Sequence, residues 1–324
     1  MAGRSTNELP AVGVETMHRG RPDHGIKGNA QMTKTILITG ATGNTGGSAI
    51  DALLERGHTG IRAMLRTDDS RAKALRDRGV ETVVGNLLDL NSIRAALKGV
   101  DAAYFVYPIE PGLIQATAYF AQAAKEVGVK AIVNMSQKSA RSDAASHAAQ
   151  DHWVGERVFD WSGVPVTHLR PTFFAEWLLY PFQIPSINRG LLRTPFGLNK
   201  HAPIAAVDQG RVVATILADP APHSGKTYPL YGPVELTQAE VAEILSKTLG
   251  RPIAFEPVSL EVFRAEIETH LKRPFLAQHL YEVARDHGTG IFAGTNDVVE
   301  TITGRPPMSI EAFVAANRAA FAER

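Results

Sequence analysis

The feature of this sequence that most constrains its fold is a glycine-rich segment, GATGNTGG, at residues 40–47. Residues 35–39, directly before it, are rich in β-branched side chains and predict a buried strand. Residues 44–56 predict a helix that ends at Gly57. A strand, a tight glycine turn and a helix in this order let the backbone approach a pyrophosphate, which the free N–H groups of the helix N-terminus would bind. The spacing is G-x-x-G-x-x-G rather than G-x-G-x-x-G, and a tight turn without a ligand is the simpler alternative.

The same alternation of short apolar runs and helix-length segments continues as far as residue 170. Further strands are predicted at residues 61–65, 81–84, 102–106, 131–135 and 167–170. Strands and helices that alternate in this way favour an α/β fold with a Rossmann-type, doubly wound parallel sheet.

The pattern changes after Pro171, where helices predominate. A helix is predicted at residues 207–217, and a strand at 227–230 would return to the sheet. Four more helices are predicted at residues 237–249, which open with a capping-box pattern, and at 260–271, 275–287 and 309–322. We therefore expect a disordered tail or tag at residues 1–32 and a dinucleotide-binding domain at 33–170, completed by about 205–232. Residues 171–204 and 233–324 would form a smaller, mainly helical substrate lobe.

Composition excludes several classes of function. Lys and Arg number 34 against 33 Asp and Glu, so the net charge is +1 and no basic surplus favours direct binding of nucleic acid. The chain has no cysteine, which excludes disulfides and thiolate chemistry, and no apolar run long enough to span a membrane. His147 and His152 lack the carboxylate or third histidine that a metal site needs. We expect a cytoplasmic monomer or homodimer that binds small molecules.

The end of the second predicted strand indicates which dinucleotide binds. NAD-binding domains place an acidic residue about 20 residues after the glycine turn, where it holds the ribose 2′-hydroxyl. Arg66 occupies this place here, with Arg62 earlier on the strand, and a guanidinium suits a 2′-phosphate. The sequence therefore favours NADP(H) over NAD(H). Asp68 and Asp69 could still hold a ribose, and a solvated arginine is the simpler alternative.

Three segments give the chain a family resemblance: TILITGATGNTGG at residues 35–47, GNLLD at 85–89 and GVPVTHLRPTFF at 163–174. With these motifs the sequence from residue 33 onward resembles the NmrA-like group of atypical short-chain dehydrogenases. That group includes NAD(P)H-dependent quinone, azo-dye and triphenylmethane reductases, and also regulators that bind the cofactor without turning it over. The resemblance implies an adenine contact at Asn86, whereas Asp89 could instead only cap the next helix. The expected cofactor-binding residues are Gly40, Thr42, Gly43, Asn44, Thr45, Gly46, Arg62, Arg66, Asn86, Leu87, Val106 and Pro171.

The catalytic pair of ordinary short-chain dehydrogenases is absent. Those enzymes use a serine with a Y-x-x-x-K helix, in which the lysine lowers the pKa of the tyrosine. Here Ser136 ends the fifth strand, and His152 and Glu156 replace the tyrosine and lysine. His152 is therefore either a general acid oriented by Glu156 or, with Glu156, one of two interacting side chains on the surface of the helix. Lys138 could approach the nicotinamide ribose or could only be solvated. The candidate catalytic residues are Ser136, Lys138 and His152.

Aromatic residues follow the sixth strand, at the end of the sheet where α/β proteins bind ligands. Residues 173–182 contain five of them. They either line a pocket for a flat substrate or join the two lobes. The expected substrate pocket comprises Tyr107, Trp153, Phe173, Phe174 and Trp177.

Three functions are compatible with these features. The leading hypothesis is an NADPH-dependent reductase of planar, electron-poor acceptors such as quinones or dyes, which need little help from an enzyme acid. A cofactor-sensing regulator without catalysis, and a biosynthetic reductase or epimerase, are the alternatives.

Overall fold

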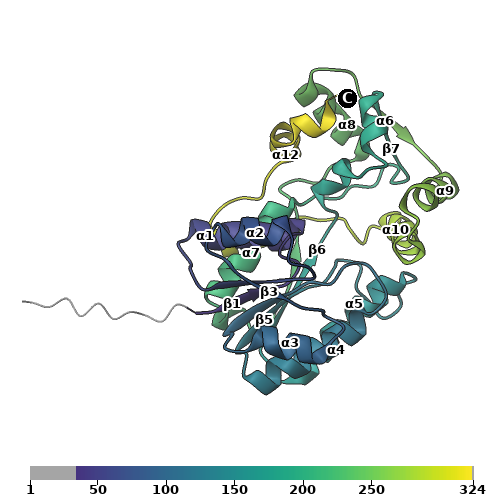
Figure 1. Ribbon diagram of the computed structural model, residues 1–324. Coiled ribbons are helices and arrows are strands. Elements are labelled where there is room, and N and C mark those ends of the chain that lie inside the picture. The colour runs from purple at the N-terminus through teal and green to yellow at the C-terminus, as the bar shows by residue number, and fades with distance from the viewer. Residues whose placement is uncertain (1–33, 323–324) are drawn as a thin grey trace, which may run out of the picture. The chain divides into compact units, whose positions relative to one another are not determined.

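A seven-stranded parallel sheet forms the centre of the protein (Figure 1). The computed structural model describes residues 34–322, so the expected tail at residues 1–32 lies outside the described residues. The strand order is β3-β2-β1-β4-β5-β6-β8, and every pairing is parallel. The strands are β1 (Ile36–Ile38), β2 (Ile61–Leu65), β3 (Glu81–Val84), β4 (Ala102–Phe105), β5 (Ala131–Met135), β6 (Val166–Pro171) and β8 (Thr227–Leu230). The strand order reverses between β1 and β4, and the predicted doubly wound fold is confirmed.

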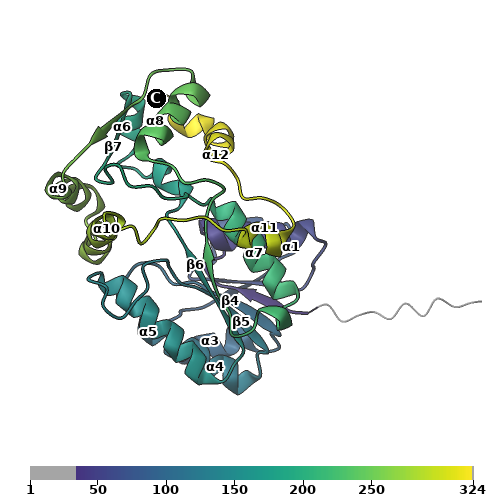
Figure 2. The same ribbon diagram turned by 180° about the vertical axis from the view of Figure 1, so that it is seen from behind.

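Helices cover both faces of this sheet (Figures 1 and 2). One face carries α1 (Asn44–Glu55), α2 (Ser70–Arg76) and α7 (Ala206–Ala218), whose apolar residues share one core with the strands. The other face carries α3 (Leu90–Leu97), α4 (Leu113–Val127) and α5 (His147–Ser162), which pack on a second core. Phe105, Phe120 and Phe159 form its centre, with ring centroids 5.0–6.4 Å apart. The central strands β1, β4 and β5 are therefore buried on both sides, as their largely apolar runs require, whereas the edge strand β3 is partly exposed.

Helices α1 and α7 approach each other closely because a glycine lies at their contact. A Cβ atom on Gly210 would lie 2.4 Å from the Cβ of Ser48 and 2.7 Å from the backbone nitrogen of Ala49. No side chain fits at this distance, so the contact fixes the spacing of the two helices. Helix α1 opens at the glycine turn, and this packing holds that turn against the sheet.

The C-terminal lobe has its own cores and a small sheet that the sequence did not reveal. Its helices are α6 (Ile184–Asn188), α8 (Gln238–Leu249), α9 (Leu260–Leu271), α10 (Pro274–His287) and α12 (Ile310–Ala316), with 3-10 turns η1 (Ala175–Leu179) and η3 (Arg318–Phe321). Strands β7 (Leu191–Thr194) and β9 (Ala254–Pro257) pair in parallel. The predicted capping box of α8 is confirmed, since Thr237 and Glu240 exchange hydrogen bonds. A further 3-10 turn, η2 (Ala221–His223), precedes β8.

One segment expected in the lobe lies elsewhere. Helix α11 (Val298–Thr303) packs against α7 and β8, and Val299 belongs to the core beneath α1 and α7. The chain therefore returns to the first layer of helices before α12 rejoins the lobe. The final predicted helix is also shorter than expected, because α12 ends at Ala316 and the next residues form a 3-10 turn.

Candidate functional site

The glycine turn between β1 and α1 brings two backbone segments into direct contact. Gly40 has a positive φ of 58°, which favours glycine. A Cβ atom on Gly46 would lie 2.3 Å from the carbonyl oxygen of Gly40. Gly43 differs, because its backbone is extended and its added Cβ would lie 3.2 Å from the same oxygen. Gly40 and Gly46 are therefore required by the fold, whereas a Cβ atom on Gly43, beside the helix N-terminus, would make a single tight contact with a backbone oxygen.

That helix N-terminus has no cap of its own. Among residues 34–322, no side chain accepts a hydrogen bond from the first turn of α1, and that turn contains no acidic residue. In contrast, Asp69, Asp89, Ser146 and Thr237 cap α2, α3, α5 and α8. The uncapped N–H groups lie beside the exposed residues Thr42, Gly43 and Asn44. Together they form a cradle that suits a phosphate group.

The two glycines give a matched pair of variants. Gly43→Val is expected to lose NADPH binding, because the side chain would occupy the cradle, and to cost less stability than Gly46→Val, because its Cβ would lie 3.2 Å rather than 2.3 Å from the carbonyl oxygen of Gly40. Gly46→Val is expected to lower the melting temperature, because the side chain meets the backbone of Gly40. Calorimetric titration with NADPH and thermal unfolding of both variants test this. Normal NADPH affinity in folded Gly43→Val would contradict the cradle.

At the end of β2 the two candidate arginines lie in different places. Arg62 donates hydrogen bonds to the carbonyl oxygens of Ala96 and Lys98, at 2.9 and 2.8 Å, and lies 2.8 Å from Glu81. It therefore fastens the end of α3 to the sheet, and its expected place in the cofactor site is corrected. It lies three residues before the end of β2, whereas the ligand edge of the sheet is at the strand ends.

Arg66 directly follows β2 and is exposed. Within the described part of the chain its side chain forms no ion pair or hydrogen bond. The neighbouring acids are already engaged, because Asp68 pairs with Arg76, and Asp69 caps α2 and pairs with Arg71. The guanidinium of Arg66 is thus the available charged group at this strand end.

The loop after β3 is ordered by its own polar side chains. Asn86 accepts a hydrogen bond from the backbone of Leu88, and Asp89 caps α3, as predicted. Leu87 packs against the core on the α3 side of the sheet. Asn86 itself is exposed, so its amide can reach a ligand over this edge.

A cavity of about 240 Å³ lies at the carboxyl ends of β4, β5 and β6. Thr45 from α1, the segment from Val106 to Ile109 and helix α10 contribute to its lining. The lining also includes Ser136, Lys138, His152, Pro171, Phe173, Phe174 and Trp177. The cavity thus brings together the expected catalytic residues, most of the expected aromatic pocket and the edge of the glycine turn.

Ser136, at the end of β5, belongs to a buried polar network. Its hydroxyl donates a 2.6 Å hydrogen bond to Glu156, which is fully buried. Arg170 binds both oxygens of the same carboxylate, at 2.8 and 2.5 Å. Burial raises the pKa of Glu156, but the hydrogen bonds from Arg170 and Ser136 outweigh it, so the pKa lies below its usual value. Because the Ser136 proton is held by Glu156, Ser136 can only accept a hydrogen bond from a ligand.

His152 is not oriented by Glu156, which corrects that part of the sequence interpretation. The carboxylate is occupied by Arg170 and Ser136, and His152 has no hydrogen-bond partner among residues 34–322. Burial, and to a lesser extent the nearby His279, lower the pKa of His152 to about 3. The imidazole is therefore neutral at pH 7 and cannot deliver a proton as imidazolium. Lys138 faces the same cavity, and its ammonium lies 5.3 Å from the centre of the Tyr231 ring.

The lowered pKa of His152 predicts acid lability. Unfolded histidine has a pKa of about 6.5, so below that pH the unfolded chain binds a proton that the folded chain excludes, and stability falls as pH falls. Between pH 7 and 5 this one group removes about 2 kcal/mol of unfolding free energy. His152→Gln should abolish that part of the pH dependence in urea titrations at the two pH values. His270→Gln, at an exposed histidine of α9, is the control. Equal pH dependence in wild type and His152→Gln would refute the assignment.

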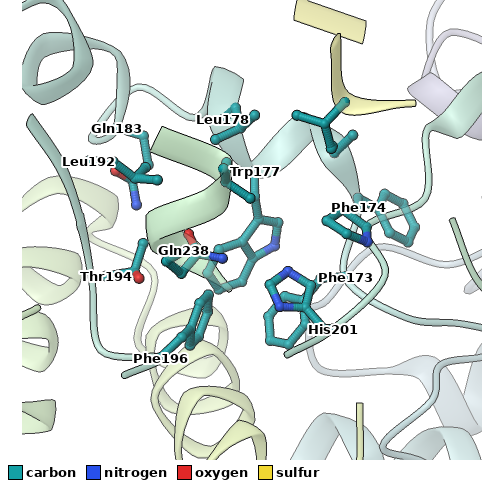
Figure 3. A pocket seen from close by; sticks show the side chains of 14 residues that line it. Phe173, Phe174, Trp177, Leu178, Gln183, Leu192, Thr194, Phe196, His201 and Gln238 are labelled. Carbon is teal, nitrogen blue, oxygen red and sulfur yellow. The ribbon is translucent and has the colours of Figure 1, made fainter. Parts of the chain in front are cut away.

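The aromatic residues after β6 both line the cavity and join the lobes. Phe173 is the hub of a cluster, with ring centroids 4.5 Å from Phe292, 4.9 Å from Trp177 and 4.9 Å from Phe196. Figure 3 shows Trp177 amid this group, beside a small second hollow of about 30 Å³. Phe173, Phe174 and Trp177 line both spaces. Lining a pocket and joining the two lobes, the two alternatives that the sequence left open, are therefore compatible.

The remaining two residues of the expected pocket, Tyr107 and Trp153, differ in whether they line the cavity. Tyr107 lines the cavity and donates a hydrogen bond to the carbonyl oxygen of Pro111 at 3.1 Å. Trp153 does not line it, and instead stacks under the guanidinium of Arg157 at 5.9 Å. Consecutive helical residues point about 100° apart, so Trp153 faces away from the cavity that its neighbour His152 lines.

Helix α10, which sequence reasoning did not include in the site, is tied down over the cavity. Arg141, after β5, binds both oxygens of Asp286 at 2.7 and 2.8 Å. Arg273 pairs with Glu110, after β4, at 2.5 Å. The helix presents Leu276, His279, Leu280 and Val283 to the cavity. The amphipathic period of residues 275–287 was visible in the sequence, but nothing local indicated which surface it covers.

Comparisons with known proteins agree with this architecture. The model of the NmrA-like family matches residues 32–303. An NAD(P)H azoreductase of Xenophilus azovorans is 33% identical over 288 residues, which cover 88% of this chain and 99% of that protein. The NADPH complex of an NADPH-dependent quinone oxidoreductase from Escherichia coli superposes with a TM-score of 0.79 at 25% identity, covering 88% of this chain and all of that one.

A third relative extends the range of substrates. The NADP(H) complex of a triphenylmethane reductase from Citrobacter sp. has a TM-score of 0.76 at 26% identity and covers 87% of this chain and 99% of that one. The family resemblance predicted from the sequence is confirmed. Between residues 34 and 322, no helix has the length and apolar character needed to cross a membrane, and no group of three potential metal ligands occurs.

Proposed function

Since this chain belongs to the NmrA-like family, we propose that it is an NADPH-dependent reductase of planar, electron-poor acceptors such as quinones or dyes. The observation that carries the proposal is the cavity at the carboxyl ends of β4–β6. It adjoins the glycine turn, is lined largely by apolar and aromatic side chains, and contains no histidine that is charged at pH 7.

The described residues fit the proposed cofactor. The cradle at Gly43 and the uncapped first turn of α1 suit its pyrophosphate, and Arg66 suits a 2′-phosphate. Asn86 and Leu87 would border the adenine, and Thr45, Val106 and Pro171 the nicotinamide end. Lys138 would approach the nicotinamide ribose. When bound, NADPH supplies the hydride.

The chain's own residues mainly position the reactants. Phe173, Phe174 and Trp177 offer ring faces and edges to a flat acceptor, and α10 adds apolar side chains beside it. Ser136 offers an accepting oxygen but no free proton, and His152 stays neutral. Acceptors that delocalise the added charge or take a proton from solvent therefore suit this site best, which disfavours simple carbonyl reduction.

The size of the cavity favours small acceptors. Its volume of about 240 Å³ lies below the roughly 300–1,000 Å³ typical of pockets for drug-sized ligands. One- and two-ring quinones would fit more readily than a three-ring triphenylmethane dye while α10 stays in place.

An acceptor screen tests the activity. NADPH oxidation should be stimulated by benzoquinone and naphthoquinone more than by a triphenylmethane dye, and Gly43→Val should be inactive with all of them. If wild type binds NADPH tightly but reduces no quinone, azo dye or enone, the reductase proposal fails, and a cofactor-sensing regulator takes its place.

The cofactor preference is tested at the two arginines. Arg66→Ala should weaken NADPH binding by about 1.5–3 kcal/mol, the usual contribution of a hydrogen bond to a charged group, and leave NADH binding unchanged. Arg62→Ala, the matched control on the strand that Arg66 follows, should lower the melting temperature but keep the ratio of the two affinities. Equal losses for NADPH and NADH in Arg66→Ala would assign that residue to the fold instead.

A further inference from the structure

The buried imidazole of His279, on α10, faces the cavity from the side opposite the sheet. It is 8% exposed, and its Nδ1 lies 2.8 Å from the hydroxyl oxygen of Ser146. His279 lines the cavity, and its other nitrogen, Nε2, has no hydrogen-bond partner among the described residues. One nitrogen is thus engaged by the protein and one is available to a ligand.

The environment of Ser146 determines which nitrogen carries the proton. Ser146 is fully buried and caps α5, where its oxygen accepts a hydrogen bond from the backbone of Ala149 at 3.1 Å. Its own proton needs an acceptor, because a buried hydroxyl proton left unpaired is costly. Within residues 34–322, Nδ1 of His279 is the only acceptor within hydrogen-bond distance. Ser146 therefore donates to Nδ1, and a neutral His279 carries its proton on Nε2.

The ring is neutral at physiological pH. Burial lowers the pKa of His279 to about 4. Nε2 is then a single, fixed N–H donor in a largely apolar cavity, held in place because α10 is tied to the loops after β4 and β5.

We propose that His279 is an acceptor-binding residue, which donates a hydrogen bond from Nε2–H to a carbonyl oxygen or an azo nitrogen of the bound substrate. This inference rests on the proposed reductase function and narrows its substrate class to planar acceptors that carry a hydrogen-bond acceptor atom. Charged groups are disfavoured at this position, because His279 offers neither a positive charge nor a second proton. His152, which also lines the cavity, has no hydrogen-bond partner among the described residues that would fix its tautomer, so it does not share this selectivity.

A pair of ring-matched probes tests the hydrogen bond without turnover. The dissociation constants of 1,4-naphthoquinone and naphthalene are measured by tryptophan fluorescence on the protein loaded with NADP⁺. The absence of cysteine removes the usual side reaction of quinones with thiols. His279→Phe should weaken naphthoquinone roughly threefold to tenfold, the contribution of one neutral hydrogen bond, and change naphthalene less than twofold. His279→Gln, which keeps an N–H donor, should recover part of the loss, and His270→Phe is the surface control.

Several results would overturn the inference. These are an equal loss of both probes in His279→Phe, no loss of either, or no binding of naphthoquinone to wild type up to its solubility limit. Nitrogen-15 NMR of the histidines gives an independent reading, since a proton on Nδ1 rather than Nε2 of His279 would also refute it. A protein that binds naphthoquinone with this selectivity but never reduces it would refute the proposed function and leave the hydrogen bond intact.

Discussion

The buried carboxylate of Glu156 is the interaction on which the candidate site depends. It joins three elements, because it lies on α5, accepts the proton of Ser136 at the end of β5, and binds Arg170 on β6. Removing one partner of a buried ion pair leaves a charge without compensation, at a cost of about 3–5 kcal/mol. The network therefore ties β5, β6 and α5 together next to Ser136, which lines the cavity. The same network places the carboxylate of Glu156 where ordinary short-chain dehydrogenases have a lysine. A carboxylate cannot lower the pKa of a tyrosine as that lysine does.

Helix α10, which also lines the cavity, is held by contacts of a different kind from those of Glu156. Helix α10 makes two ion pairs to loops that follow β4 and β5, and one of them, Arg141–Asp286, is largely buried on the acid side. Its apolar face meets the cavity and the Phe173 cluster. Helix α10 is thus held by two ion pairs and by aromatic packing, whereas the Glu156 network joins α5 to strands β5 and β6 of the sheet. Any opening of the cavity to exchange a substrate would move α10 rather than the strands.

The sequence predicted those parts of the molecule that local patterns determine. The glycine turn, the seven strands and the caps of α3 and α8 each depend on residues within a few positions of one another, and their signals were correctly interpreted. The errors arose where a contact joins distant segments. Arg62 looked like a cofactor ligand until its partners, 34 and 36 residues further on, were visible. Trp153 was expected in the pocket, but only its neighbour His152 lines the cavity. The β7–β9 pair joins strands about 60 residues apart, each only four residues long, and no local pattern predicts such a pairing.

The same distinction explains why the cofactor was easier to infer than the acceptor. A pyrophosphate is bound by backbone N–H groups, and the glycines that expose them are contiguous in the sequence. The acceptor would instead be surrounded by side chains from segments far apart in the sequence, among them the segments that follow β4, β5 and β6 and helix α10. Both histidines that line the cavity are neutral at pH 7, so we expect selectivity to depend on shape and on single hydrogen bonds such as the one proposed for His279. A single substitution can change such contacts without altering the fold, and proteins of similar fold are accordingly named as reductases of azo dyes, quinones and triphenylmethane dyes.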